Sequence, residues 1–167
     1  MDEQRDTAVP IHPDAPAWFG RALAEPFEDG AVEVDGTPIH YLAWGRPDRR
    51  GLVFVHGGGA HAHWWTHVAA TFARQFRVVA VDLSGHGSRY ASPQLIDWAQ
   101  AIVVMDRHNL EDLRRLYPEA EERTFPLGAF LEQPRQEIED PYYLDLERAT
   151  QVYAQMHQAV TTMLSFQ

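Results

Sequence analysis

Three short apolar runs in the middle of the chain constrain the fold more than any other feature of the sequence. They cover residues 52–55, 78–81 and 101–104, and segments with helix-forming patterns separate them. A continuous apolar run of about 4–8 residues is typical of a strand buried on both faces, as strands in parallel sheets are. Strands that alternate with helices predict an α/β fold with right-handed crossovers.

The N-terminal part of the chain predicts an arm followed by a hairpin. Residues 1–30 hold four of the eleven prolines and predict an arm with one short helix near residues 15–25. Residues 32–34 and 39–44 are β-rich runs around an Asp-Gly turn dipeptide. This pattern indicates two antiparallel strands joined by a tight turn.

Helix signals follow the buried strands. We expect helices over residues 63–75, 93–99 and 109–117, with Ser92 and Asn109 as N-caps, because both side chains accept hydrogen bonds from a first helical turn.

The C-terminal part of the chain adds one strand and one helix. Residues 123–127 predict an edge strand, since Pro126 has no N–H to donate to a neighbouring strand. Residues 145–164 place apolar side chains three and four positions apart, which predicts an amphipathic helix.

The composition narrows the classes of partner. The chain has a formal net charge of −10 and no lysine, which disfavours attraction to nucleic-acid phosphates. No apolar stretch is long enough to span a bilayer, and the absence of cysteine excludes disulfides and thiolate catalysis. We expect one soluble, cytoplasmic domain over residues 1–167, without a cofactor and without nucleic-acid or membrane partners.

The first half of the chain carries motifs of a known family. Residues 52–61 read Leu-Val-Phe-Val-His-Gly-Gly-Gly-Ala-His, and residues 79–88 read Val-Ala-Val-Asp-Leu-Ser-Gly-His-Gly-Ser. Together with the hairpin around residues 34–45, they resemble the α/β-hydrolase family over about residues 31–88. The resemblance implies an oxyanion loop after the first motif, whose backbone N–H groups stabilise a tetrahedral intermediate.

That family's nucleophile is missing from the sequence. The resemblance implies a nucleophile elbow at the end of the next strand, a strained turn with small residues on both sides of the nucleophile. Here the position reads Val104-Met105-Asp106-Arg107-His108, and Gly-x-Ser-x-Gly occurs nowhere. Asp106 would serve only as an aspartate-type nucleophile, and its bulky neighbours do not suit the tight turn.

The second half of the chain resembles a different family. Residues 97–120, 127–130 and 137–143 follow, in order, the pattern of low-molecular-weight protein tyrosine phosphatases over about residues 92–164. The last of these segments reads Glu-Ile-Glu-Asp-Pro-Tyr-Tyr.

The resemblance implies roles for three residues of this segment. Asp140 would be the general acid that protonates the leaving phenolate, and Tyr142 and Tyr143 would form an aromatic wall beside the substrate. The phosphatase signature Cys-(x)5-Arg cannot occur in a chain without cysteine. The general acid therefore has no nucleophile to work with.

Overlaying the two families predicts a specific topology. The resemblances imply that the third and fourth hydrolase strands coincide with the first and second phosphatase strands. We expect a three-layer α/β/α domain, a hybrid of hydrolase-like and flavodoxin-like folds. Its sheet should be mostly parallel, with about six strands in the order 1-2-4-3-5-6 and an N-terminal antiparallel hairpin.

The overlay also divides the chain into segments. An arm over residues 1–30 should precede a hydrolase-like segment, 31–88, and a phosphatase-like segment, 89–167, with the junction between residues 85 and 92. The loops at 56–61, 82–89, 106–109 and 137–143 should then meet at the carboxyl edge of the sheet, where a crevice is expected.

These observations favour a protein without an evolved catalytic function. We expect an engineered or recombined chimera that lacks both parental nucleophiles. The sequence leaves open whether the protein is an enzyme, and the missing nucleophiles argue against catalysis. One alternative is a weak ester or phosphoester hydrolase that uses His56 or His86 with Asp140.

The glycine-rich loop suggests an anion-binding site. Backbone N–H groups after a strand attract anions, so another alternative is a small phosphate or sulfate site. Its predicted residues are Gly57, Gly58, Gly59, Ala60 and His61.

A histidine pair in the same region has the spacing of metal ligands on one helix face. His63 and His67 are four positions apart, and with Asp82 or Asp140 they would form a ligand set. The same run is ordinary sequence among hydrolase-like proteins, so we expect no metal. We also expect that an uncovered sheet or helix surface could support a homodimer.

Overall fold

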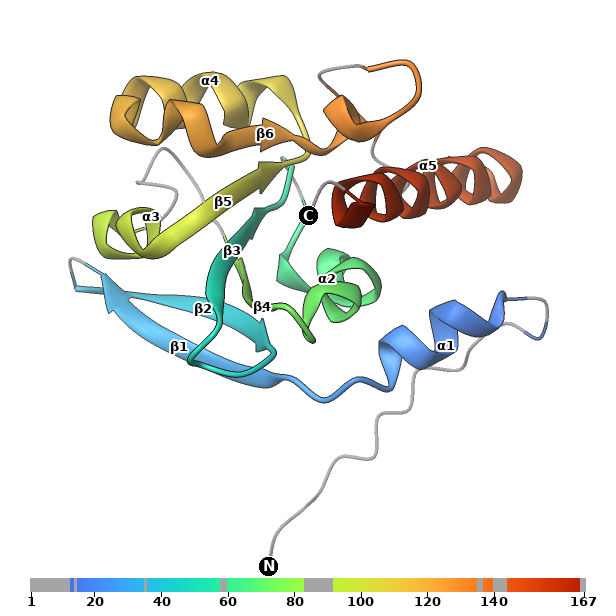
Figure 1. Ribbon diagram of the computed structural model, residues 1–167, viewed down its shortest axis with the longest axis horizontal. Coiled ribbons are helices and arrows are strands. Elements are labelled where there is room, and N and C mark those ends of the chain that lie inside the picture. The colour runs from blue at the N-terminus through green and yellow to red at the C-terminus, as the bar shows by residue number, and fades with distance from the viewer. Residues whose placement is uncertain are drawn as a thin grey trace, which may run out of the picture.

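A six-stranded sheet between two helical layers forms the centre of the protein (Figure 1). The computed structural model describes residues 13, 15–34, 36–57, 60–82, 92–134, 137–139 and 144–165. The strands are β1 (Glu28–Val34), β2 (Thr37–Trp44), β3 (Arg50–Val55), β4 (Phe76–Val81), β5 (Ala99–Val104) and β6 (Thr124–Pro126).

The helices cover the sheet from both sides. The α-helices are α1 (Ala17–Leu23), α2 (Thr66–Phe72), α3 (Pro93–Trp98), α4 (Arg107–Leu116) and α5 (Leu146–Ser165). The 3-10 helices are η1 (Ala62–Trp65), η2 (Pro118–Arg123) and η3 (Leu127–Phe130). Helices α2 and α5 pack on one face of the sheet, and α3 and α4 pack on the other.

The strand order confirms the predicted topology. The sheet runs β1-β2-β4-β3-β5-β6. Pairs β1–β2 and β2–β4 are antiparallel, and pairs β4–β3, β3–β5 and β5–β6 are parallel. The fold is therefore a mixed α/β sheet with a leading antiparallel hairpin.

The central strands are buried on both faces, as the apolar runs predict. In β3, Leu52 and Phe54 face the α2–α5 layer, and Val53 and Val55 face the α3–α4 layer. All four side chains are fully buried. Because successive strand residues point to opposite faces, one short run contributes to two separate cores.

The predicted helix over residues 63–75 is shorter and less regular than expected. It begins as η1 and continues as α2, which ends at Phe72. Its end is tightened by bonds from the Ala73 N–H to the Ala70 carbonyl and from the Gln75 N–H to the Phe72 carbonyl. Hydrogen bonds between residues three positions apart, as in a 3-10 helix, commonly close the ends of α-helices.

The N-cap of α4 differs from the sequence prediction, whereas that of α3 agrees with it. Ser92 caps α3, and its hydroxyl accepts a bond of 3.1 Å from the Leu95 N–H. Helix α4 is capped by Asp106 rather than by Asn109, which lies inside the first turn. The Asn109 N–H donates to Asp106 Oδ1 at 2.7 Å.

The far edge of the sheet is formed by β6, as predicted from Pro126. Within the described part of the chain, none of the helices has the length and apolar character needed to cross a membrane.

Candidate functional site

The carboxyl ends of three neighbouring strands bring the candidate site together. Strands β3, β4 and β5 end at Val55, Val81 and Val104. The residues that follow them include His56, Asp82 and Asp106, so the polar side chains lie at one edge of the sheet, as predicted for an α/β fold.

Asp106 occupies the position where the hydrolase resemblance implies a nucleophile. Its backbone has φ −124° and ψ 165°, which is ordinary extended geometry rather than a strained turn. Its carboxylate caps α4, with Oδ1 accepting from the Asn109 N–H and Oδ2 from Asn109 Nδ2 at 3.3 Å. The structure thus uses Asp106 to begin a helix.

Gly57 makes room for this carboxylate. A Cβ atom at Gly57 would lie 2.9 Å from Asp106 Oδ2, closer than real Cβ contacts allow. At this position the glycine-rich loop is adapted to a neighbouring side chain of the same protein.

Asn109 connects the start of α4 to the loop after β3. Its side chain is buried, and Nδ2 donates to the His56 carbonyl at 2.6 Å. A buried carbonyl needs such a partner, because leaving it unbonded costs free energy.

His56 is buried and favours its neutral form. Burial lowers the pKa of His56 below its ordinary value, although the bond to the Gly57 carbonyl and the charge of Asp82 oppose the shift. Nδ1 donates to that carbonyl at 2.8 Å, so Nδ1 carries the proton of the neutral ring. Nε2 lies 3.8 Å from Asp82 Oδ1.

Asp82 joins three segments at this edge. Its Oδ1 accepts from the Ala62 N–H at 2.5 Å, which fixes the start of η1. Its Oδ2 lies 2.6 Å from Nδ1 of His40 on β2. The other ring nitrogen of His40 lies 2.9 Å from Asp29 Oδ1 on β1.

The two carboxylates favour the charged form of His40. Carboxylates only accept hydrogen bonds, so both ring nitrogens must donate, which only the protonated ring can do. Burial alone would lower the pKa of His40, but the hydrogen bonds to Asp82 and Asp29 outweigh it and raise the pKa.

Sequence reasoning did not find the Asp29–His40–Asp82 cluster. It depends on the register of β1 on β2, where Ala31 lies opposite His40, and on the adjacent end of β4. The short turn between β1 and β2 could have suggested that these strands pair, which brings Asp29 close to His40.

An acidic cleft of about 240 Å³ opens beside the glycine-rich loop. Its lining includes Gly57 and Ala60, together with the carboxylates of Asp106, Glu137 and Glu139. Arg107 and Arg148 form ion pairs with the two glutamates and partly neutralise them.

The structure brings together only part of the predicted residue set. Gly57 and Ala60 line the cleft, His56 is buried beside Gly57, and His61 is exposed at the start of η1. Several predicted residues lie outside the described residues: Gly58, Gly59, His86, Asp140, Tyr142 and Tyr143.

The two histidines considered for a metal lie in different surroundings. His63 is exposed, and its ring faces those of His40 and His61. His67 is buried among Phe19 and Tyr153. Among the described residues, no three His, Asp or Glu side chains are arranged to hold a metal ion.

Comparison with known proteins finds both families. Residues 52–128 match the model of the alpha/beta hydrolase family. Epoxide hydrolase 3 of Xenopus tropicalis is 30% identical over 84 residues, which are 50% of this chain and 22% of that protein. A low-molecular-weight protein-tyrosine-phosphatase of Klebsiella pneumoniae is 30% identical over 79 residues, which are 47% of this chain and 54% of that protein.

A solved structure supports the phosphatase-like fold. The YwlE arginine phosphatase from Geobacillus stearothermophilus superposes with a TM-score of 0.52 and 16% identity, covering 68% of this chain and 90% of that protein. The chain spans 22% of the length of the epoxide hydrolase and 54% of the length of the Klebsiella phosphatase. It is similar to α/β hydrolases and to low-molecular-weight tyrosine phosphatases, and its fold combines features of both.

Proposed function

We propose that this protein is a recombined α/β domain, an engineered chimera of two parents, that folds without an evolved catalytic function. The observation that carries the proposal is the state of Asp106. At the position where a hydrolase-like nucleophile is expected, an unstrained aspartate caps a helix with Oδ1 and accepts from the Asn109 side chain with Oδ2.

The chemistry of the site supports this proposal. In the α/β-hydrolase arrangement a strained turn presents the nucleophile, and a serine nucleophile also needs an adjacent base. The sequence offers no cysteine and no Gly-x-Ser-x-Gly motif. Asp106 Oδ2 lies against Gly57 and Asn109. What remains at the sheet edge is a set of accessory groups.

The topology supports a chimeric origin. The fold keeps the strand order of a hydrolase, and similarities to both families occur in one chain. We place the junction between residues 85 and 92, in a single domain over residues 1–167. The match to the hydrolase family model extends past this junction to residue 128.

Hydrolysis assays test the proposal. The wild-type protein would be assayed with a p-nitrophenyl ester, a p-nitrophenyl phosphate and a small epoxide, the last because one relative is an epoxide hydrolase. Exposed histidines hydrolyse activated esters slowly by themselves, so His108→Ala is the matched control for His56→Ala.

We expect kcat/KM to agree within about twofold among the wild type and both variants. A loss of about tenfold or more in His56→Ala alone would contradict the proposal.

A weak ester or phosphoester hydrolase is the second candidate. The observation that favours it is the neutral ring of His56, whose Nε2 lies 3.8 Å from Asp82 Oδ1. A neutral imidazole can act as a general base toward water. Turnover that His86→Ala or Asp140→Asn abolishes would establish this candidate in place of the first.

Anion binding at residues 57–61 is disfavoured by the charge of the cleft. Asp106, Glu137 and Glu139 line the same space as Gly57 and Ala60, and carboxylates repel phosphate or sulfate. Titration with inorganic phosphate, followed by amide NMR of Ala60 and His61, tests for such a site.

A further inference from the structure

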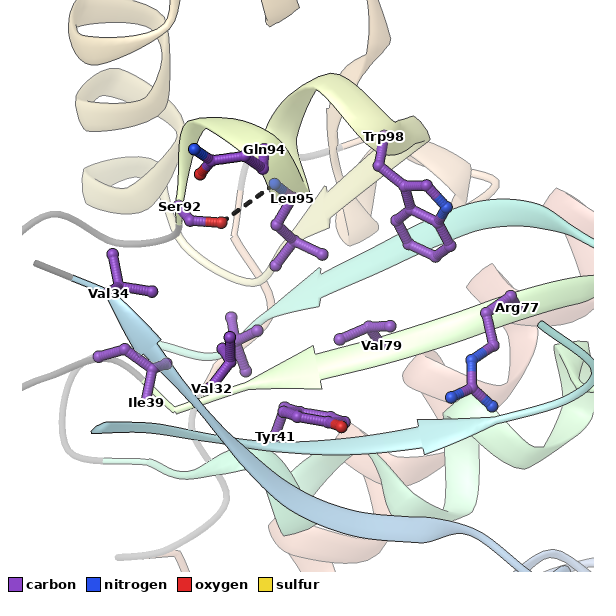
Figure 2. Close-up of a pocket in the computed structure, with 11 residues that line it drawn as sticks. Val32, Val34, Ile39, Tyr41, Arg77, Val79, Ser92, Gln94, Leu95 and Trp98 are labelled. Carbon is purple, nitrogen blue, oxygen red and sulfur yellow. Dashed lines mark hydrogen bonds between the residues drawn. The ribbon is translucent and has the colours of Figure 1, made fainter. Parts of the chain in front are cut away.

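An apolar cavity lies between the N-terminal hairpin and α3, on the opposite face of the sheet from His40. It measures about 350 Å³, within the usual range of small-molecule sites. Figure 2 shows Val32, Tyr41 and Val79 on the sheet, with Leu95 and Trp98 of α3 pointing toward them.

Alternation along three strands builds the floor of this cavity. Val32 and Val34 of β1, Ile39 and Tyr41 of β2, and Val79 and Val81 of β4 each stand two residues apart. Residues with this spacing share one face of a sheet. The intervening residues of β4 pack in the opposite core, under α2 and α5.

Two aromatic rings packed against glycines form walls of the cavity. A Cβ at Gly30 would come within 2.9 Å of the Tyr41 ring, and one at Gly51 within 2.7 Å of the Trp98 ring. Each ring therefore lies directly against a strand backbone, and neither can shift toward the sheet.

The cavity exists because α3 is short. Its six residues extend about 9 Å, whereas the seven residues of β1 extend about 23 Å. Helices α3 and α4 cover the sheet around β3 and β5. On the same face, none of the described helices covers the part formed by β1, β2 and β4, and Val32 is 50% exposed.

Charges near the cavity indicate which ligand it accepts. Arg77 lines it, but its guanidinium already donates to Glu28 at 2.5 Å and to the Gly45 carbonyl at 2.8 Å. The cation is therefore neutralised within the protein and gives no preference for an anion.

The rim supplies neutral polar groups. Ser92 and Gln94 line the cavity at the start of α3. A hydroxyl and an amide can bond one polar group of a ligand whose remaining surface is apolar.

A second copy of this chain fits the surface poorly. The edge strand β1 carries Glu28, Asp29 and Glu33, so two copies that met along this edge would bring like charges together.

We propose that this cavity binds small, uncharged, flat apolar molecules of about the size of a two-ring aromatic, with one hydroxyl or carbonyl at the Ser92–Gln94 rim. An apolar protein cavity of about 150 Å³ holds benzene, and this cavity is roughly twice that size. Tyr41 and Trp98 provide aromatic walls for such a ring. This site is separate from the residues at the carboxyl edge.

Calorimetric titration of the full chain with 2-naphthol tests the proposal, with amide NMR to locate the site. Val79→Phe fills the floor of the cavity. Ala31→Phe adds the same ring to β1 on the opposite face and serves as the matched control, since Ala31 neighbours Val32 and is exposed. If Val79→Phe does not fold, as judged by thermal unfolding, Leu95→Trp fills the cavity from α3.

We expect saturable 1:1 binding with a dissociation constant on the order of 0.1 mM. The filling variant should raise the dissociation constant at least about tenfold, and Ala31→Phe should change it by less than about twofold. Absence of saturable binding up to about 1 mM, or equal affinity in the filling variant, would overturn the proposal. So would a homodimer that the filling variant dissociates, because the face would then belong to a second copy.

Discussion

Asp82 illustrates how much of this site depends on single side chains. One carboxylate bonds to the amide of Ala62 and to the ring of His40, and it lies near His56. It therefore connects the end of β4 with the hairpin and with the loop after β3. Together with the cap that Asp106 forms for α4, these bonds give the described polar side chains of the carboxyl edge structural partners.

His40 should make the protein more stable when it is protonated. Its folded pKa is raised above 6.5 by Asp82 and Asp29, which outweigh the effect of burial. The contribution is fully present below pH 6.5 and is lost as the pH rises through the folded pKa. Urea unfolding of the wild type and of His40→Gln measures it.

The stability advantage of the wild type over His40→Gln should shrink as the pH rises above about 6.5. His61→Gln, at an exposed histidine of the same region, is the control. A difference that stays constant or grows with pH would contradict this account of His40.

His67 should have the opposite effect. Burial, with a smaller contribution from His157, lowers the pKa of His67 to about 4. Because the folded pKa lies below that of the unfolded chain, the stability is present above pH 6.5 and is lost as the pH falls toward 4.

Because of His67, we expect the free energy of unfolding to fall by about 2 kcal/mol when the pH is lowered from 7 to 5. His67→Phe should remove this part of the acid dependence, and it also removes Nε2, which has no hydrogen-bond partner in the described part of the chain. Unfolding free energies at the two pH values test this. An unchanged pH dependence in His67→Phe would refute it.

Gly45 and Gly36 form a natural pair for testing backbone strain against packing. Both have positive φ, 77° and 78°. A Cβ at Gly36 would meet nothing within 4 Å, whereas one at Gly45 would collide with the carbonyl oxygens of Ala73 and Phe76.

Gly36→Ala should therefore cost only the left-handed backbone strain, about 1–2 kcal/mol, and Gly45→Ala clearly more. Thermal and urea unfolding measure both variants. Equal losses in the two would show that the contact at Gly45 does not matter.

Among the elements, the central strands were the most predictable. Continuous apolar runs gave β3, β4 and β5, and Pro126 indicated the edge position of β6. The α4 N-cap was assigned wrongly because Asp106 and Asn109 are both good capping residues. The residue at which β5 ends determines which of the two caps the helix, and the pairing of β5 with β3 sets that residue.

The contact between α4 and the β3 loop gives a prediction at the element scale. Asn109→Ala removes the donor to the buried His56 carbonyl. We expect a loss of about 1–3 kcal/mol in unfolding free energy, because that carbonyl loses its bonded partner. Ser92→Ala, which removes the α3 cap, should cost about 1 kcal/mol and provides the comparison. A loss below that of Ser92→Ala would contradict the importance of the contact.

Across the whole molecule, topology was predictable and the site was predictable only in part. The strand order followed from overlaying two families on a shared strand-helix pattern, since both place these strands at the same positions. The Asp29–His40–Asp82 cluster and the cavity beside α3 depend on strand register and on helix length. Neither has a motif that sequence alone displays.

The central claim is that the nucleophile position of this hybrid fold serves structure and not catalysis. Asp106→Ala tests it most directly when unfolding free energy and ester and phosphoester hydrolysis are measured on the same sample. The account predicts a stability loss of about 1 kcal/mol from the missing α4 cap, with unchanged hydrolysis rates. A drop of about tenfold or more in hydrolysis, with stability unaltered, would contradict it.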